Sequence, residues 1–170
     1  MTYNATLEKS TPLGTFYETE VPERWIDYNG HMNVGGYFEM FETAADHFIE
    51  SAIGLDAAYA KNLGLSTFTG DFHICYRAET KRGERLKIAS RVLGFDEKRF
   101  HLYQEMHVEG ENPRLAAACE HLVLHVSLDG PKVTPLPADR LERLEAAFRA
   151  HQAAFDAPQF ANRMIKTPGE

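Results

Sequence analysis

The strongest constraint on the fold is one long amphipathic helix that precedes a series of alternating segments. From Val34 to about Ile53, apolar residues recur at a helical period, while acidic residues occupy much of the opposite side. Gly54 follows directly and is placed to end this helix. Because no other long helix precedes the alternating segments, the apolar face can be buried only against the sheet that they form.

After residue 70 the period changes to two. Apolar and polar residues alternate in four successive segments, which are separated by turn-prone sequences and lie at residues 71–77, 86–92, 99–109 and 119–128. This pattern predicts four antiparallel strands joined as a meander, preceded by a strand at Thr15–Trp25 that is bent or at an edge. A second amphipathic stretch predicts a C-terminal helix from Ala138 to Phe155. The predicted fold class is α+β, with one antiparallel sheet wrapped around a long central helix.

Composition indicates one domain and argues against a nucleic-acid partner. A chain of 170 residues that is 44% hydrophobic is long enough for a single packed domain, which we place at residues 15–156. We expect an irregular N-terminal segment at 1–14 and a flexible tail at 157–170. The net charge of -7 leaves no basic stripe of the kind that neutralises a phosphate backbone.

Cysteine and histidine spacing favours reduced thiols and no metal site. Cys75 and Cys119 are far apart and form no Cys-x-x-Cys motif, as is usual in a cytoplasmic protein. The first residues do not have the pattern of a targeting segment, so we expect none, and we expect no membrane span because the sequence has no apolar run that is long enough. Four strand histidines are expected on the face opposite the apolar one, and their separation does not favour a shared metal ion; they are His101, His107, His121 and His125.

The stretch from Trp25 to Phe41, WIDYNGHMNVGGYFEMF, concentrates small and polar residues where the central helix begins. One interpretation is structural, because Asn29-Gly30 favours a tight turn and Asn33 can cap the helix. The other is functional. Backbone N–H groups at a helix entrance lack intrahelical partners and can hold an oxyanion, and the carboxylate of Asp27 lies on the turn just upstream.

The residues of this stretch resemble a known signature. The motif Asp27-x-x-Gly30-His31-Met32-Asn33, with Tyr37 and Phe41-Glu42-x-Ala44 after it, resembles that of hotdog-fold acyl-CoA thioesterases, the superfamily of 4-hydroxybenzoyl-CoA thioesterase. Further stretches, including GLDAAYA and LGFDEKRFH, look like the betainyl-CoA thioesterase domain that is fused to carnitine dehydrogenases. The similarity runs from about Thr15 to Ala150, and its order of elements agrees with the layout predicted from periodicity.

The resemblance implies roles for individual residues. It places the catalytic carboxylate, acting as nucleophile or general base, at Asp27 and the oxyanion donor at the backbone N–H of Val34. His31 and Asn33 would shape the turn or contact the thioester and the water. Three further residues are candidates for the substrate site: Gly30, Gly35 and Tyr37.

Two further groups of residues are weaker candidates. Asp71, and with it His73 on the same face of its strand, is a candidate second catalytic or substrate-orienting group. The candidate contacts for coenzyme A phosphates are basic residues of the hairpins, namely Arg77, Arg82, Lys98 and Arg99.

Together these observations predict a thioesterase that hydrolyses a small or medium acyl-CoA, without a cofactor beyond the coenzyme A of the substrate. The resemblance implies a homodimer or homotetramer, and exposed sheet edges give a physical reason for assembly. Two alternatives stay open: a non-catalytic acyl-binding protein of the same fold, and a dehydratase or hydratase.

Overall fold

The computed structural model describes residues 11–161, 165 and 168. One antiparallel sheet, in the order β1-β3-β4-β5-β2 with β6 paired to β5, forms the body of the molecule. Its strands are β1 (Phe16–Glu20), β2 (Leu65–Tyr76), β3 (Arg85–Phe95), β4 (Arg99–Val108), β5 (Arg114–Ser127) and β6 (Lys132–Val133).

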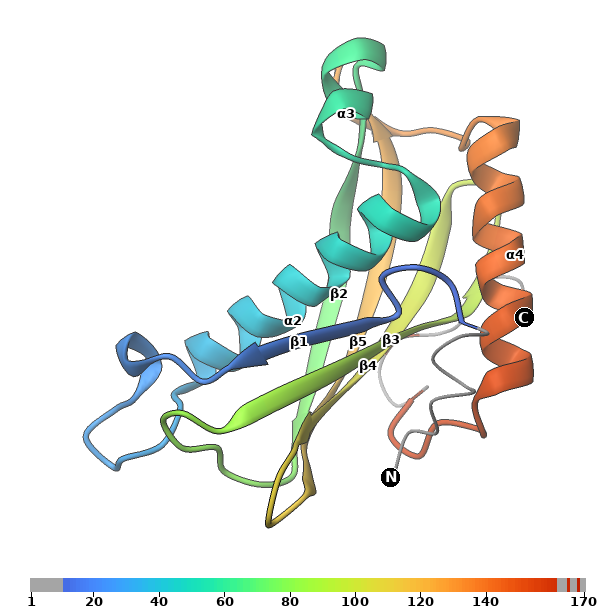
Figure 1. Ribbon diagram of the computed structural model, residues 1–170. Helices are drawn as coiled ribbons and strands as arrows, with labels where there is room; N and C mark the ends of the chain where they lie inside the picture. Colours follow the sequence, from blue (N-terminus) through green and yellow to red (C-terminus); the bar gives the residue numbers. More distant parts are fainter. Residues whose placement is uncertain (1–10, 162–164, 166–167, 169–170) are drawn as a thin grey trace.

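The sheet curls around one long helix, α2 (Figure 1). This helix continues into a π-helical segment and ends at Gly54, which adopts a left-handed conformation with φ of 81°. The other helices are short or lie outside the sheet's concave face. The helices of the described residues are η1 (Glu23–Trp25), α2 (Val34–Phe48), η2 (Ile49–Ile53), α3 (Ala57–Leu63) and α4 (Ala138–Ala154). The predicted α+β architecture, with a sheet around a central helix and a C-terminal helix, is therefore confirmed.

Strand pairing differs in part from the expected meander. The strands β3, β4 and β5 do follow one another across the sheet, but β2 pairs with β5 and not with β3. The first strand is also shorter than predicted, because β1 ends at Glu20 and the chain then forms η1. The bend lies at Pro22, which supplies no backbone N–H for a ladder.

The core lies between α2 and the concave face of the sheet. Phe41 and Phe48 of the helix are fully buried, as are Phe100, Leu102 and Met106 of β4, and alternate β4 residues point the other way. The four strand histidines do not share one face. His101 and His107 lie on the outer face as predicted, but His121 and His125 face the helix side, where His121 contacts Glu42 of α2 and His125 contacts Tyr59 of α3.

The predicted domain boundaries stay a prediction. Residues 1–10 of the expected irregular segment and residues 162–164, 166–167 and 169–170 of the expected tail lie outside the described residues. Within the described part of that tail, Phe160 is buried against Tyr103 and Ala118 on the outer face of the sheet. No helix in the described part of the chain has both the length and the apolarity that crossing a membrane requires.

His151 of α4 ties the C-terminal helix to the edge of the sheet. Its Nδ1 accepts a hydrogen bond from the backbone N–H of Val92 at 3.0 Å, and its Nε2 lies 3.1 Å from Oγ1 of Thr15. Burial, with a smaller contribution from the charge of Arg91, lowers the pKa of His151 to about 4. A second proton on this ring would have to bind Nδ1, where it would face the N–H of Val92 and break that hydrogen bond.

We therefore expect the stability of this protein to fall as the pH drops below neutrality. The unfolded chain binds a proton at His151 near pH 6.5, whereas the folded chain does so only near pH 4. Between these values this group should cost up to about 1.4 kcal/mol of unfolding free energy per pH unit. Urea midpoints at pH 7 and pH 5 measure the loss. The variant His151→Gln should show a smaller pH dependence, and a matched change at the exposed His47 of α2 should not.

Candidate active site

The turn that carries Asp27 is closed by its own backbone. The N–H of Asp27 donates to the carbonyl of His31 at 3.0 Å, and the N–H of Gly30 donates to the carbonyl of Asp27 at 3.0 Å. Gly30 has φ of 79°, a region that favours glycine. The carboxylate of Asp27 accepts the N–H of Asn29 at 2.8 Å, so the turn fixes the direction of this side chain.

Asn33 is the N-cap of α2 and leaves one amide of the first turn free. Its Oδ1 accepts the N–H groups of Gly35 at 2.9 Å and of Gly36 at 3.3 Å. Within the described residues, the N–H of Val34 donates to no carbonyl or side chain. This amide is the predicted oxyanion donor, and the positive end of the helix dipole lies beside it.

The two glycines of this first turn are explained by close packing. A Cβ on Gly35 would lie 2.9 Å from the ring of Trp25, and one on Gly36 would lie 2.5 Å from Cγ of Met32. Both glycines therefore allow the start of the helix to press against the preceding turn. That packing holds the helix entrance close to the segment that carries Asp27.

Val34, which carries this amide, is one of the residues around an open, mainly apolar cavity of about 420 Å³. Residues of α2 and of the end of β2 line it: Val34, Gly35, Phe38, Phe72, Ile74 and Tyr76. Tyr37 lies elsewhere, with its ring buried and its hydroxyl donating to the carbonyl of Ala78 at 3.0 Å. Burial raises the pKa of Tyr37, which keeps the phenol protonated for this contact. The structure thus gives Tyr37 a space-filling and hydrogen-bonding role.

The structure does not bring Asp71 and His73 to this entrance within one chain. Phe72 and Ile74 of β2 pack into the helix-side core, so their neighbours point to the outer face. On that face Nδ1 of His73 lies 3.7 Å from the buried carboxylate of Glu120. Asp71 is exposed and accepts the N–H of Phe72.

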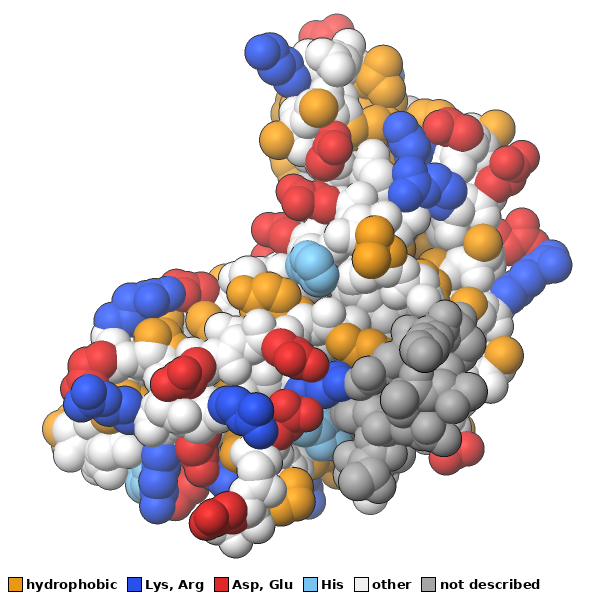
Figure 2. Space-filling model, viewed as in Figure 1, with side chains coloured by type: hydrophobic (Ala, Val, Ile, Leu, Met, Phe, Trp, Pro, Cys, Tyr) orange, Lys and Arg blue, Asp and Glu red, His pale blue; other side chains and the backbone are white. Residues whose placement is uncertain are grey.

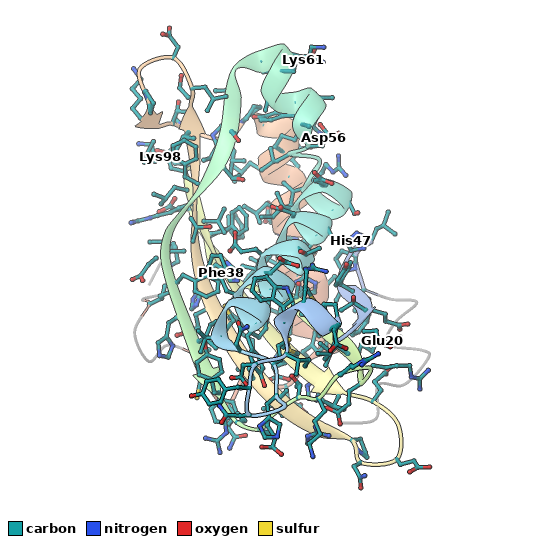
Figure 3. The ribbon with its side chains drawn as sticks, turned by 90° about the vertical axis from the view of Figure 1, so that its left-hand side faces the viewer. Glu20, Phe38, His47, Asp56, Lys61 and Lys98 are labelled. Carbon is teal, nitrogen blue, oxygen red and sulfur yellow. The ribbon has the colours of Figure 1, made fainter. Side chains whose placement is uncertain are left out.

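The basic candidates are also dispersed. Lys98 and Arg99 begin β4 at the end of the sheet far from the helix entrance, about 30 Å along a strand of this length. In Figure 3, Lys98 lies in the upper half of the view, above Phe38. Arg82 pairs with Glu23 at 2.6 Å, and Arg77 lies over the ring of Phe160. On the face in Figure 2, basic and acidic side chains are interspersed, and no basic stripe is visible.

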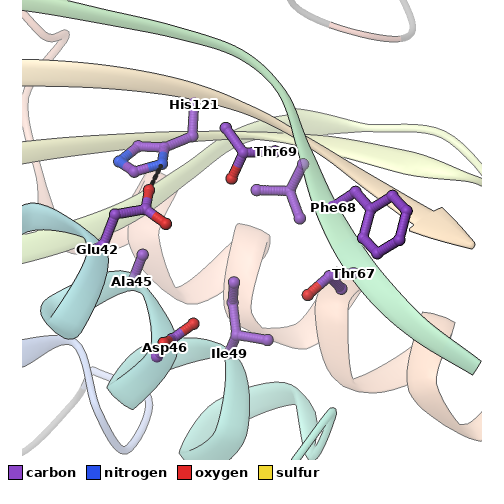
Figure 4. A pocket seen from close by; sticks show the side chains of 9 residues that line it. Glu42, Ala45, Asp46, Ile49, Thr67, Phe68, Thr69 and His121 are labelled. Atoms are coloured by element: carbon purple, nitrogen blue, oxygen red, sulfur yellow. Dashed lines mark ion pairs between the residues drawn. The ribbon is translucent and has the colours of Figure 1, made fainter. Parts of the chain in front are cut away.

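A second cavity, which the sequence did not indicate, lies farther along α2. It has a volume of about 390 Å³ and lies between the helix and β2 (Figure 4). Carboxylates of Glu42 and Asp46 line it together with Thr67, Thr69 and His121. Burial raises the pKa of Asp46, and the neighbouring charges of Glu42 and Glu50 raise it further.

A row of hydrogen-bonded, buried polar side chains extends from this cavity into the core. Nδ1 of His121 lies 3.3 Å from Glu42, and its Nε2 lies 2.8 Å from Oε1 of Gln104. The amide of Gln104 then donates to Oγ of Ser90 at 2.9 Å. The spacing of these residues on three adjacent strands could have suggested a shared row, but only the register places them side by side.

A curled antiparallel sheet around a long central helix is the architecture of hotdog-fold thioesterases. Residues 21–144 match the sequence model of the Thioesterase-like superfamily, and the chain belongs to this superfamily. By class it is a thioester hydrolase.

Two relatives and two solved structures agree with this assignment. The betainyl-CoA thioesterase of Pseudomonas aeruginosa is 38% identical over 154 residues, which are 91% of this chain and 95% of that protein. The L-carnitine dehydrogenase/betainyl-CoA thioesterase of Rhizobium meliloti is 35% identical over 94% of this chain, but the match covers only 31% of that longer protein.

The structural matches show the same fold. A putative thioesterase from Pseudomonas putida superposes with a TM-score of 0.73 at 36% identity and covers 89% of this chain and 95% of its own. A hypothetical protein from Staphylococcus aureus, solved in complex with CoA, gives a TM-score of 0.81 at 22% identity, covering 91% of this chain and 95% of its own.

The row of buried polar side chains that includes Gln104 predicts how a substitution there changes the unfolding free energy. Replacing Gln104 with Met keeps a similar volume but leaves the hydroxyl of Ser90 and Nε2 of His121 without their partner in the core. Since each such group costs about 1–3 kcal/mol, the unfolding free energy should fall by roughly 2–4 kcal/mol. Urea denaturation measures it. Ser90→Ala, which removes only the end of the chain, should cost clearly less; an unchanged midpoint for Gln104→Met would contradict the role of this row.

Proposed function

We propose that this protein hydrolyses a small or medium acyl-CoA to the free acid and coenzyme A. The observation that carries the proposal is the N–H of Val34, which has no partner among the described residues and belongs to a residue that lines an apolar cavity. Such an amide can hold the carbonyl oxygen as it becomes an oxyanion, and the cavity offers apolar surface to the acyl group. The reaction needs no cofactor other than the coenzyme A of the substrate.

Asp27 supplies the carboxylate of the proposed reaction. The backbone of Asp27 is hydrogen-bonded to that of His31, and His31 lies three residues before Val34. At about 3.3 Å per residue, the backbones of Asp27 and Val34 are therefore about 10 Å apart. The side chain of Asp27 and a bound thioester carbonyl can together span this distance. The carboxylate either attacks the carbonyl carbon or takes a proton from the attacking water, and the C–S bond then breaks with its electron pair on sulfur.

Betainyl-CoA is the first substrate to test. The 38% identity to the betainyl-CoA thioesterase of Pseudomonas aeruginosa extends over nearly the whole of both chains. A panel of small and medium acyl-CoAs beside it would define the acyl preference.

Two variants test the carboxylate and the amide separately. Asp27→Asn should lower kcat/KM by about a hundredfold or more, because the carboxylate is lost while its turn contacts can persist. Val34→Pro removes the single N–H that the proposal uses, yet proline is favoured at the first position of a helix. We expect it to reduce kcat on the order of a hundredfold. Thiol release from the acyl-CoA panel measures both.

The control is Val34→Ala, which keeps the amide and should retain most of the activity. Circular dichroism should show similar melting for all three variants. Equal thiol release by wild type and Asp27→Asn would refute a catalytic carboxylate, and binding without release would favour an acyl-binding protein. After one turnover in ¹⁸O-labelled water, label in the carboxylate of Asp27 would show the nucleophilic role, because a general base forms no bond to the water oxygen.

We further propose that a second copy of this chain covers β2. Among the described residues, this strand of 12 residues pairs only with β5, which leaves a long free edge. Large apolar side chains beside it are exposed: Val34 by 68%, Phe38 by 48%, Phe68 by 47% and Tyr76 by 48%. A free edge next to apolar surface is typical of a subunit interface.

The assembly can be tested with a single charge. Phe68→Lys adds an ammonium beside the free edge without touching the core, and should shift the protein toward monomer. Light scattering after size-exclusion chromatography measures the mass at several concentrations. Leu128→Lys, at an exposed residue in the turn after β5, is the matched control. A wild type that stays monomeric at high concentration would refute this proposal.

A further inference from the structure

Three consecutive residues of the loop between β2 and β3 contact the segment that carries Asp27. The carbonyl of Thr80 accepts the N–H of Met32 at 2.9 Å, and the carbonyl of Ala78 accepts the hydroxyl of Tyr37 at 3.0 Å. Between them, the side chain of Glu79 reaches the ring of His31. Oε2 of Glu79 and Nε2 of His31 are 3.1 Å apart.

Arg114, the first residue of β5, holds this loop in place. Its Nη2 donates to the carbonyl of Glu79 at 2.8 Å and to both carboxylate oxygens of Glu84, at 2.9 Å and 2.7 Å. Partial burial alone would raise the pKa of Glu84, but the hydrogen bonds from Arg114 and from the backbone of Lys81 outweigh it and lower that pKa. The backbone of Glu79 is therefore anchored independently of its side chain.

The contact between Glu79 and His31 favours one placement of the ring proton. When a carboxylate accepts the Nε2–H of a neutral imidazole, the proton is fixed there and Nδ1 is left as the acceptor. His31 belongs to the same closed turn as Asp27, because its carbonyl accepts the N–H of Asp27. The free nitrogen therefore belongs to the turn where the proposed reaction takes place.

We propose that Glu79 is a positioning residue of the active site, which fixes the ring of His31 so that Nδ1 accepts a hydrogen bond from the water that enters the reaction. In the general-base route the water oxygen bonds to the thioester carbonyl carbon while its proton passes to Asp27, and the C–S bond breaks with its electron pair on sulfur. In the nucleophilic route the water oxygen bonds to a carbonyl carbon of the mixed anhydride formed with Asp27, the C–O bond of the anhydride breaks, and the released carboxylate takes the proton. Glu79 itself touches no substrate. This inference rests on the proposed function and adds the residue that orients the water.

The test combines kinetics with a double-mutant cycle. Glu79→Ala removes the acceptor but leaves the three backbone contacts of the loop, and should lower kcat about ten- to a hundredfold with KM nearly unchanged. Glu79→Gln keeps an acceptor oxygen and should recover much of this loss. In a His31→Ala background, Glu79→Ala should have no further effect, because Glu79 acts through His31. Glu97→Ala is the control, an exposed glutamate paired with Lys98 at the far hairpin.

Nitrogen-15 NMR of the histidine rings reads the tautomer without turnover. We expect His31 to carry its proton on Nε2 in the wild type and to become a tautomer mixture in Glu79→Ala. Full activity of Glu79→Ala, an unchanged tautomer, or additive losses in the cycle would overturn the positioning role. If Glu79→Ala is unimpaired but Asp27→Asn is inactive, only this inference fails. Equal activity of Asp27→Asn and wild type would mean that the proposed function fails.

Discussion

Burial of α2 along its whole length is the constraint on which the rest of this structure depends. Phe41 and Phe48 have no exposed surface, and the sheet curls around the helix to cover them. A helix enclosed in this way can present only its ends and one flank to solvent. Its N-terminus emerges at one end of the sheet, where the Asp27 turn and the loop of Glu79 meet. The position of the site thus follows from the need to bury the helix.

The chemistry of the helix entrance comes from local packing. Asn33 satisfies the amides of Gly35 and Gly36, and both glycines admit the close approach of Trp25 and Met32. Together these contacts leave the amide of Val34 as the one that can serve a ligand. The same residues thus support both interpretations of the stretch: they cap and pack the helix, and in doing so they expose a donor.

The sequence predicted local features well, but it did not predict which face of each strand is buried. The helix from Val34, its cap at Asn33 and the β period follow from nearest neighbours. In β5, however, His121 was expected opposite the buried face, whereas it points to the helix together with Cys119 and Val123. An alternating pattern shows that successive side chains point to opposite faces of the sheet. It does not show which of the two faces the helix covers. The chain of Ser90, Gln104, His121 and Glu42 was missed for this reason, since it exists only once register and sidedness are fixed.

The pairing of β2 with β5 has a consequence for how the chain reaches this structure. Leu65 lies opposite Ser127 and Tyr76 lies opposite Ala117, so β2 leaves the ribosome well before its partner exists. Until β5 emerges, the edge of β2 that pairs with it has no native neighbour. Closure by such distant contacts is slow compared with local hairpins. The nascent chain should therefore complete its sheet late in synthesis, and shielding by chaperones would matter most for the stretch that follows α3.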